Sequence, residues 1–309
     1  MSKMKIATTI GEFYDFVPTP ADAVRAYEGT GFRYLDYSFY RMFRRGCPFL
    51  EDDWKREVTD AGNAAAALGF SFVQAHAPAY NPMGDELTDH EAGMLSYHRA
   101  IEACGMLGIR NMVIHTGITP RYPYPEGMEV YMAETKVFLD KLIPELERYN
   151  VCLCMENSAE ANMRGSDGKV RYFPMTAADL NTMIDYIGHP LVKACWDVGH
   201  GHMRGTDPYA EITGLGKNLA AIHIHDNHGV RDEHLALFDG TIDVDAILRG
   251  LRDIAFSGPF TLESDSFFRA KRREAKENDR LAAPPLAVKR AAVRLMYETA
   301  NACLEAYGL

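Results

Sequence analysis

The sequence predicts an α/β fold, a single (β/α)8 TIM barrel with parallel strands and its active face at their carboxyl ends. Short β-rich runs alternate with longer helical patterns through nearly all of the 309 residues, which is typical of a parallel sheet with crossover helices. Eight such units can be counted, the number that closes this barrel. A doubly wound sheet is the alternative, but no Gly-x-Gly-x-x-Gly follows the first strand. The unbroken alternation predicts one domain over residues 1–309.

The expected strands are short apolar runs rich in β-branched and aromatic residues. They cover residues 5–10, 34–40, 70–76, 111–115, 151–157, 192–197, 220–225 and 259–263. Helical patterns lie within residues 22–31, 54–69, 91–108, 130–150 and 177–188, and a final one lies within 284–308. Several of these patterns stop at Gly or Asn, as the C-caps of helices do.

Two insertions interrupt this rhythm, at about residues 158–175 after the fifth strand and about residues 266–285 after the eighth. Loops that follow barrel strands lie on the active face. We therefore expect both segments to cover the active site.

Composition narrows the choice of partner and compartment. A net charge of -10 provides no electrostatic footprint for nucleic acid, which is a disfavoured partner. No run approaches the roughly 20 apolar residues of a membrane helix. Cys152, Cys154 and Cys195 lie in strand-like runs, which favours buried thiols in a reducing compartment over disulfides. A cytoplasmic protein is expected.

Each strand from the third to the eighth ends in an imidazole or a carboxylate. These residues are His76, His115, Glu156, Asp197 with His200 close behind it, the pair His223 and His225, and Glu263. The carboxyl ends of barrel strands share one mouth, so these side chains should converge. Three carboxylates there would repel each other unless a cation neutralised them. Mixed oxygen and imidazole donors favour Mn²⁺, Zn²⁺, Co²⁺ or Mg²⁺.

Some of these residues have a structural alternative. A lone strand-end histidine, such as His76 or His115, is more often a hydrogen-bonded rim residue than a ligand. His223 and His225 are two apart in a strand and therefore share a face, so that one can bind metal and the other substrate.

Residues in the loops after the strands are further candidates for the polar site at the mouth of the barrel. Asp232 and His234 can return over the mouth, or remain in a solvated loop with a helix-capping role. Tyr80, Trp196 and Phe268 can form apolar walls for a substrate, with barrel or loop packing as the alternative.

The motifs "MENSAE", "WDVGHGH", "IHIHDNHGVRDEH" and "LESDS" stand at successive strand ends. With them, essentially the whole chain resembles the xylose isomerase-like barrels, which unite sugar phosphate isomerases and epimerases with endonuclease IV. The resemblance implies one divalent metal ion, with Mn²⁺ as the first choice, held by Glu156, Asp197, His223 and Glu263. His223 is preferred to His225 because the family pattern His-x-x-Asp ends here at Asp226.

The resemblance also implies a reaction. A metal-dependent isomerase or epimerase would act on a ketose or related polyhydroxy carbonyl compound through an enediolate, with Glu156 and Glu263 as general base and acid. His200 corresponds to a substrate-contacting histidine of the epimerases. The remaining polar residues of the mouth are expected to bind the sugar: His76, His115, His225, Asp232 and His234.

The chain departs from the free-ketose 3-epimerases at two positions. Those enzymes carry a second substrate-binding Glu and an Arg where this sequence has Asn162 and Gly229, with Arg231 two residues later. A lyase or dehydratase with the same chemistry, such as one that cleaves carbon-linked glycosides or dehydrates an inosose, is therefore an alternative. A lyase would allow a separate partner subunit.

Two further classes remain open. Endonuclease IV relatives bind three zinc ions through nine ligands, and this sequence has a candidate for each: the four metal ligands above together with His76, His115, His200, Asp232 and His234. A trinuclear zinc phosphodiesterase is thus the hydrolase alternative, and a non-catalytic sugar-binding barrel is the third. Such barrels often pair through surface helices, so a homo-oligomer is compatible with any of them.

Overall fold

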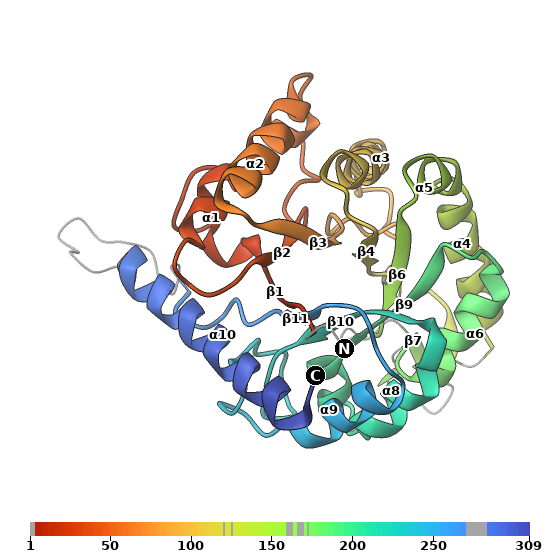
Figure 1. Cartoon of the computed structure of the whole chain (residues 1–309). Coiled ribbons are helices and arrows are strands. Elements are labelled where there is room, and N and C mark those ends of the chain that lie inside the picture. Colours follow the sequence, from red (N-terminus) through yellow and green to blue (C-terminus); the bar gives the residue numbers. More distant parts are fainter. Residues whose placement is uncertain are drawn as a thin grey trace.

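The computed structural model describes residues 4–119, 121–124, 126–158, 163–165, 170–171, 173–269 and 283–309. Eight parallel strands close into a barrel in the order β1-β11-β10-β9-β6-β4-β3-β2 (Figure 1). Their bounds are β1 Ile6–Thr9, β2 Tyr34–Ser38, β3 Ser71–His76, β4 Asn111–Ile114, β6 Cys152–Glu156, β9 Val192–Asp197, β10 Leu219–Ile224 and β11 Phe260–Leu262. The predicted (β/α)8 barrel is confirmed.

Helices surround the barrel and cover its outer face (Figure 1). They are α1 Pro20–Ala26, α2 Trp54–Leu68, α3 His90–Leu107, α4 Met128–Asp140, α5 Ile143–Tyr149, α6 Ala177–Ile187, α7 Val198–Met203, α8 Pro208–Leu215, α9 Val244–Asp253 and α10 Leu286–Tyr307. In the described part of the chain, 3-10 turns lie at Ile10–Phe13, Pro48–Leu50 and Gly216–Asn218. None of the described helices is both long and apolar enough to span a membrane.

The local sequence explains several helix boundaries. Thr176 and Asp179 form a reciprocal capping box at the start of α6, which satisfies backbone donors that have no partner inside the helix. Gly69 and Gly108 end α2 and α3 in the left-handed conformation, which glycine adopts without steric cost.

The single helical pattern expected over residues 130–150 is two helices, α4 and α5. Pro144 stands in the first turn of α5. A proline has no N–H to donate to the carbonyl four residues earlier, and its ring clashes with that carbonyl. The proline therefore favours the break between α4 and α5.

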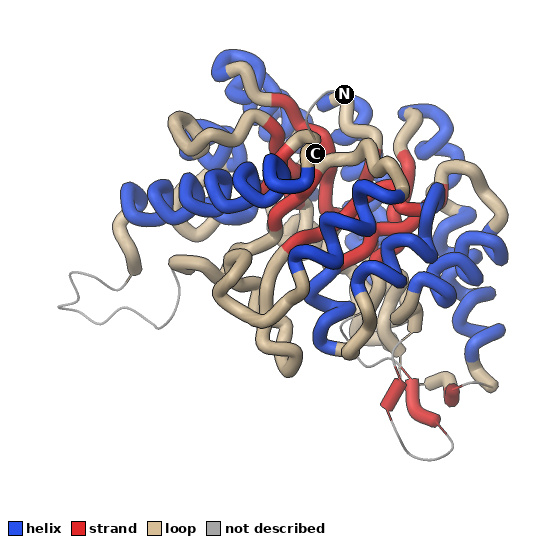
Figure 2. Tube along the Cα trace, turned by 60° about the horizontal axis from the view of Figure 1, so that its bottom comes forward, coloured by secondary structure: helices blue, strands red, loops and turns tan. Residues whose placement is uncertain are grey.

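A second, three-stranded sheet was not expected. It consists of β5 Pro123–Tyr124, β7 Met163–Gly165 and β8 Val170–Arg171, and it extends from the end of the molecule where long loops gather (Figure 2). Strands of two or three residues are too short to show an alternating pattern. Residues 159–162, 166–169, 172 and 270–282, within the two predicted covering loops, lie outside the described part of the chain.

The barrel interior differs from the large core between strands and helices. Val113, Cys154, Cys195 and Ala221 form a separate buried cluster inside the barrel. All six cysteines are free thiols, as expected for Cys152, Cys154 and Cys195 from their strand-like runs. Above this cluster, at the carboxyl ends of the strands, the inward-facing side chains become polar.

Candidate metal centre

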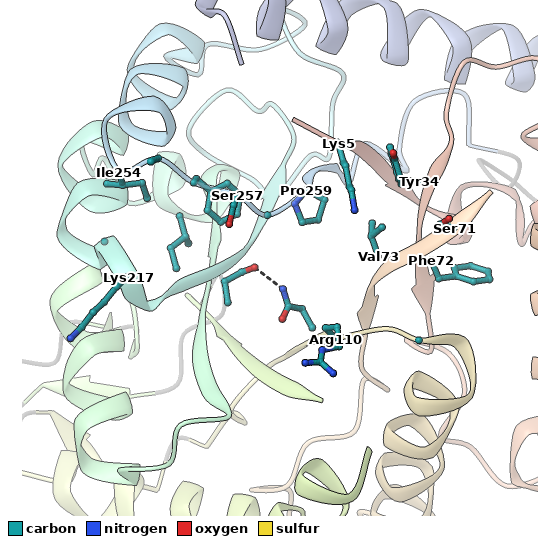
Figure 3. A pocket seen from close by; sticks show the side chains of 18 residues that line it. Lys5, Tyr34, Ser71, Phe72, Val73, Arg110, Lys217, Ile254, Ser257 and Pro259 are labelled. Atoms are coloured by element: carbon teal, nitrogen blue, oxygen red, sulfur yellow. Dashed lines mark hydrogen bonds between the residues drawn. The ribbon is translucent and has the colours of Figure 1, made fainter. Parts of the chain in front are cut away.

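Seven of the ten predicted site residues line a cavity of about 340 Å³ at the carboxyl ends of the strands. The other three, Asp197, His223 and His225, are buried and are not among its lining residues. A larger cavity of about 640 Å³ lies at the opposite, amino-terminal end of the strands, where Lys5, Tyr34 and Arg110 line it (Figure 3). It contains none of the predicted site residues. The imidazoles and carboxylates that could bind a metal ion or transfer a proton are therefore concentrated at the carboxyl ends of the strands, the usual active face of this barrel.

Four side chains from consecutive barrel strands form the first group. Glu156, Asp197, His223 and Glu263 each have a donor atom within 4.8 Å of those of the others. Nδ1 of His223 lies 3.1 Å from Oε1 of Glu156, 3.1 Å from Oε2 of Glu263 and 4.0 Å from Oδ2 of Asp197. This is the set that the family resemblance implied as metal ligands.

Electrostatics within this group are strongly coupled. Burial alone would raise the pKa of Glu156, but the imidazoles of His223 and His115 hold that pKa well below its ordinary value. Burial likewise opposes ionisation of Glu263, and His223 lowers its pKa below the usual range. Burial would lower the pKa of His223, whereas Cys195, Glu263 and Glu156 raise it well above normal. The site thus favours charged carboxylates next to a positive charge.

A divalent cation fits these donors. Three carboxylates and an imidazole provide oxygen and nitrogen ligands of the kind that Mn²⁺, Zn²⁺ and related ions accept. Oε2 of Glu156 is buried and makes no aligned hydrogen bond, although Nε2 of His115 is 3.1 Å away and Nε2 of His76 is 3.7 Å away. A carboxylate oxygen in this state is available as a ligand.

A second group of possible ligands contains His200, His225, Asp232 and His234, whose donor atoms also lie within 4.8 Å of one another. Oδ2 of Asp232 is 3.1 Å from Nε2 of His234 and 3.5 Å from Nε2 of His200. The rings of His225 and His234 are stacked, with centroids 4.3 Å apart. Asp232 and His234 therefore return over the mouth, and neither caps a helix.

A third group joins the first. His76, His115 and Glu156 have donor atoms within the same 4.8 Å limit, so Glu156 belongs to both groups. His76 is buried, whereas the side chain of His115 is 41% exposed and lines the cavity. The structure thus brings all ten predicted site residues to one mouth.

The loop from β10 to α9 is shaped by buried polar side chains. Asp226 accepts hydrogen bonds from the backbone N–H groups of Asn227, Phe238 and Ile242, and its backbone pairs with Leu235. This pairing turns the intervening segment back toward the barrel. Asp232 and His234 reach the mouth for that reason.

The opposite wall of the cavity was missed by the sequence analysis. It is formed by Thr9, Tyr14, Ser38, Tyr40, Arg41, Asp265, Ser266 and Arg269. Thr9 and Ser38 end β1 and β2, so the same strand-end argument would have found them had it been extended beyond imidazoles and carboxylates. The arginines lie in loops, where no periodic pattern signals an inward direction.

The aromatic walls suggested by the sequence are not in this cavity. Tyr80 and Trp196 are buried in packing, and the Tyr80 hydroxyl bonds to Nδ1 of His90 at 2.6 Å. Phe268 is partly exposed but is not among the lining residues. Tyr14 and Tyr40 are the aromatic side chains that line it.

These features define a barrel protein with a polar, carboxylate-rich mouth. The chain belongs to the xylose isomerase-like TIM barrel family, whose model matches residues 24–301. The resemblance seen in the strand-end motifs is thereby confirmed.

Two proteins of other organisms are similar in sequence to about half of this chain. An uncharacterized protein of Sinorhizobium fredii is 25% identical over 175 residues, which are 56% of this chain and 53% of that protein. An uncharacterized protein of Methanocaldococcus jannaschii is 25% identical over 167 residues, which are 53% of this chain and 54% of that one. The matched region spans about half the length of each of these relatives.

Solved structures resemble the whole chain. The 3-keto-D-glucoside 4-epimerase of E. coli has a TM-score of 0.67 at 17% identity, covering 96% of this chain and 100% of that one. A D-allulose 3-epimerase from Methylomonas sp. has a TM-score of 0.70 at 14% identity, covering 97% and 98%. At these identities the likeness establishes the fold.

Proposed function

We propose that the protein is a divalent-metal-dependent sugar isomerase or epimerase. The observation that carries this proposal is the pairing of Glu156 and Glu263, from different strands, around a single imidazole with 3.1 Å contacts on both sides. Paired carboxylates beside a cation suit the removal and return of a carbon-bound proton. Several structural neighbours are sugar epimerases, which supports the same chemistry.

Glu156, Asp197, His223 and Glu263 would hold the metal ion. When bound there, a divalent cation polarises a substrate carbonyl and acidifies the adjacent C–H bond. Mn²⁺ is our first choice because oxygen donors outnumber nitrogen donors three to one in this group. The free thiols suit a reducing compartment such as the cytoplasm.

The carboxylates have distinct tasks in this proposal. Both have pKa values held below their ordinary range, so each is ionised at neutral pH, which is the state that a general base needs. Glu156, buried at the end of β6, and Glu263, just after β11, approach the cavity from different strands. In an epimerisation one would take the proton from a substrate carbon, and the other would return a proton to the opposite face of that carbon.

The remaining residues would bind and orient the sugar. A cavity of about 340 Å³ lies in the size range of small-molecule sites, and a monosaccharide fits it better than a polymer. His115, His200, Asp232 and His234 line it, and each can form hydrogen bonds with hydroxyl groups. His76 lines it too, while His225 supports Asp197 through contacts of 3.1 Å to both carboxylate oxygens.

The departures from the ketose 3-epimerase pattern keep the lyase and dehydratase alternatives within this proposal. Asn162 lies outside the described residues. Gly229 and Arg231 are not among the lining residues, whereas Arg41 and Arg269 are. Guanidinium groups that contact the substrate would thus come from the segments after β2 and after β11.

A second candidate function, a trinuclear zinc phosphodiesterase, is favoured by the two additional ligand groups. Together the three groups contain the nine residues expected of that centre and also His225. The net charge of -10 opposes binding of a polyanion. We therefore rank it second.

The metal content of the purified protein distinguishes the single-metal isomerase or epimerase from the trinuclear phosphodiesterase. Elemental mass spectrometry of the wild type, Glu156→Gln and His115→Ala should give about one ion per chain in the wild type, loss in Glu156→Gln and retention in His115→Ala. Solvent deuterium should enter a substrate from a panel of ketoses and keto-glycosides. About three zinc ions per chain, reduced in His115→Ala, would instead establish the phosphodiesterase, to be tested on abasic DNA.

A further inference from the structure

Two arginine side chains line the same mouth cavity as Glu156 and Glu263. Arg41 follows β2 in the chain, and Arg269 follows β11. Their side chains are 50% and 46% exposed, so both guanidinium groups are only partly covered by protein and can be reached from the cavity. The proton transfer proposed for the two glutamates uses neither of them.

A single carboxylate, Asp15, holds both arginines. Nη1 of Arg41 lies 2.8 Å from Oδ1 of Asp15, and Nε of Arg269 lies 4.0 Å from Oδ2. The side chain of Asp15 is only 11% exposed. Asp15 follows β1, which pairs with β11 on one side and with β2 on the other. Three adjacent barrel strands thus bring two cations to one largely buried anion.

The charges of this cluster do not balance. The two guanidinium groups carry two positive charges and Asp15 one negative charge, and the arginines have more N–H donors than one carboxylate can accept. Asp265 also lines the cavity, but its Oδ1 lies 3.5 Å from Nδ1 of His234 and so faces an imidazole. The cluster is therefore suited to accept a further anionic group from a molecule in the cavity.

Guanidinium groups are well suited to phosphate and carboxylate. Their planar N–H fork can bind two oxygens of such a group at once, and these charge-assisted hydrogen bonds are stronger than those to a neutral hydroxyl. Ser38, at the end of β2, and Ser266, after β11, also line the cavity. Their hydroxyls can donate to the same anionic group.

We propose that Arg41 and Arg269 form an anion-binding subsite of the candidate active site, and that the substrate is an acidic sugar, a polyhydroxy carbonyl compound that carries a phosphate or carboxylate group. The carbonyl end of this molecule lies at the metal group, and its anionic end lies against the arginines. This inference rests on the proposed isomerase or epimerase function and narrows its substrate class.

A matched panel of ligands tests the subsite. Ketohexoses are compared with their 6-phosphates and with the corresponding keto-uronates, which carry a carboxylate at carbon 6. Titration calorimetry of the Mn²⁺-supplemented protein should show about 10–100-fold tighter binding of the acidic members than of the neutral sugars, the usual gain from charge-assisted hydrogen bonds. The acid that binds more tightly identifies the anionic group. Exchange of solvent deuterium into the same compounds measures turnover separately.

Substitutions of the two arginines separate the subsite from the rest of the cavity. Arg41→Gln and Arg269→Gln should each reduce the preference for acidic sugars about 10-fold, and the double variant should abolish it. Affinity for neutral ketohexoses should fall much less. A general loss of structure would weaken both classes of ligand equally, so the ratio of the two affinities isolates the subsite.

Arg44→Gln is the matched control. Arg44 lies in the same segment as Arg41 and is exposed, but it is not among the residues that line the cavity. This variant removes the same charge from the chain and should keep the wild-type preference for acidic sugars.

Two results would overturn the inference and leave the proposed function in place. One is metal-dependent deuterium exchange into neutral ketohexoses with no preference for the acidic members. The other is a preference that the double arginine variant retains, which would place the anionic group on the metal ion. A wild-type protein that binds no member of the panel and exchanges deuterium into none would overturn the proposed function and this inference with it.

Discussion

Asn157 joins the ends of two neighbouring strands at the candidate metal centre. Its Nδ2 donates to the carbonyl of Asp197 at 2.9 Å, its Oδ1 accepts from the Asp197 N–H at 2.6 Å, and its carbonyl lies 2.9 Å from Nδ1 of His200. The side chain therefore fixes Glu156, its chain neighbour, relative to Asp197 on β9.

We expect Asn157→Ala to lower the free energy of unfolding by about 2–4 kcal/mol, because two buried backbone groups lose their partners. Metal affinity should fall as well, since Glu156 and Asp197 are no longer held together. Urea unfolding and metal titration measure the two effects. Asn63→Ala, at an exposed position of α2, is the control and should remain within about 0.5 kcal/mol of wild type. An equally small effect at Asn157 would contradict its linking role.

A substitution at Asp232 tests whether this carboxylate contacts the substrate or binds a second metal ion. In the single-metal proposal, Asp232→Asn keeps about one ion per chain and raises KM about 10–100-fold, the effect of one lost charge-assisted hydrogen bond. The turnover number should change little, because the proton-transferring carboxylates are untouched. Steady-state kinetics and metal analysis of the same preparation test this. Loss of a metal ion in Asp232→Asn would place a ligand there.

Among single residues, the sequence was sufficient to identify the polar side chains that follow apolar strands. Imidazoles and carboxylates at strand ends were recognisable because apolar runs precede them. Arg41 and Arg269 could not be found, because loop conformation determines which way they point.

Among the elements, α10 is fastened to the barrel by a buried ion pair. Nζ of Lys289 lies 2.5 Å from Oε2 of Glu12, in the turn after β1, and 2.6 Å from the carbonyl of Phe267, after β11. One lysine thus connects the last helix to the loops behind two strands of the mouth.

Lys289→Met should destabilise the protein by about 3–5 kcal/mol, because it leaves a buried carboxylate uncompensated. Burial raises the pKa of Glu12, and Lys289 opposes that rise. A carboxyl whose pKa is raised by folding contributes stability at low pH that is lost as pH rises through the folded pKa. The variant removes the opposing cation, so its deficit relative to wild type should be larger at pH 7.5 than at pH 5.

Chemical denaturation of both proteins at the two pH values provides the measurement. The double variant Glu12→Leu with Lys289→Met should recover most of the lost stability, because no buried charge remains. A deficit that is independent of pH, or that the double variant does not reduce, would show that lost packing of the lysine stem is responsible.

Element prediction succeeded where the pattern was long and failed where it was short. The barrel strands stand out as apolar runs between helical patterns, and the long helices have enough residues for periodicity to appear. The break at Pro144 was visible in the sequence, but the expected pattern ran through it. The sheet of β5, β7 and β8 depends on pairing between remote short segments, which local sequence does not encode.

For the molecule as a whole, the ring of parallel strands concentrates like charges at one end. Glu156, Asp197 and Glu263 converge there because β6, β9 and β11 all end at the same mouth. Without a cation, their repulsion and burial oppose folding. The fold and the metal should therefore be linked thermodynamically.

Metal binding should accordingly stabilise the entire barrel. At a free metal concentration 100 times Kd, a ligand that binds only the folded state adds about 2.7 kcal/mol, and each kcal/mol raises the melting temperature by about 2–4 °C in domains of 150–250 residues. Calorimetry with Mn²⁺ or with a chelator should therefore differ by several degrees. Glu156→Gln should lose most of that difference, whereas Glu86→Gln, at an exposed loop position, should keep it. A wild-type melting temperature unaffected by chelation and by added Mn²⁺, Co²⁺ or Zn²⁺ would mean that histidines alone balance these carboxylates, and the metal assignment would fail.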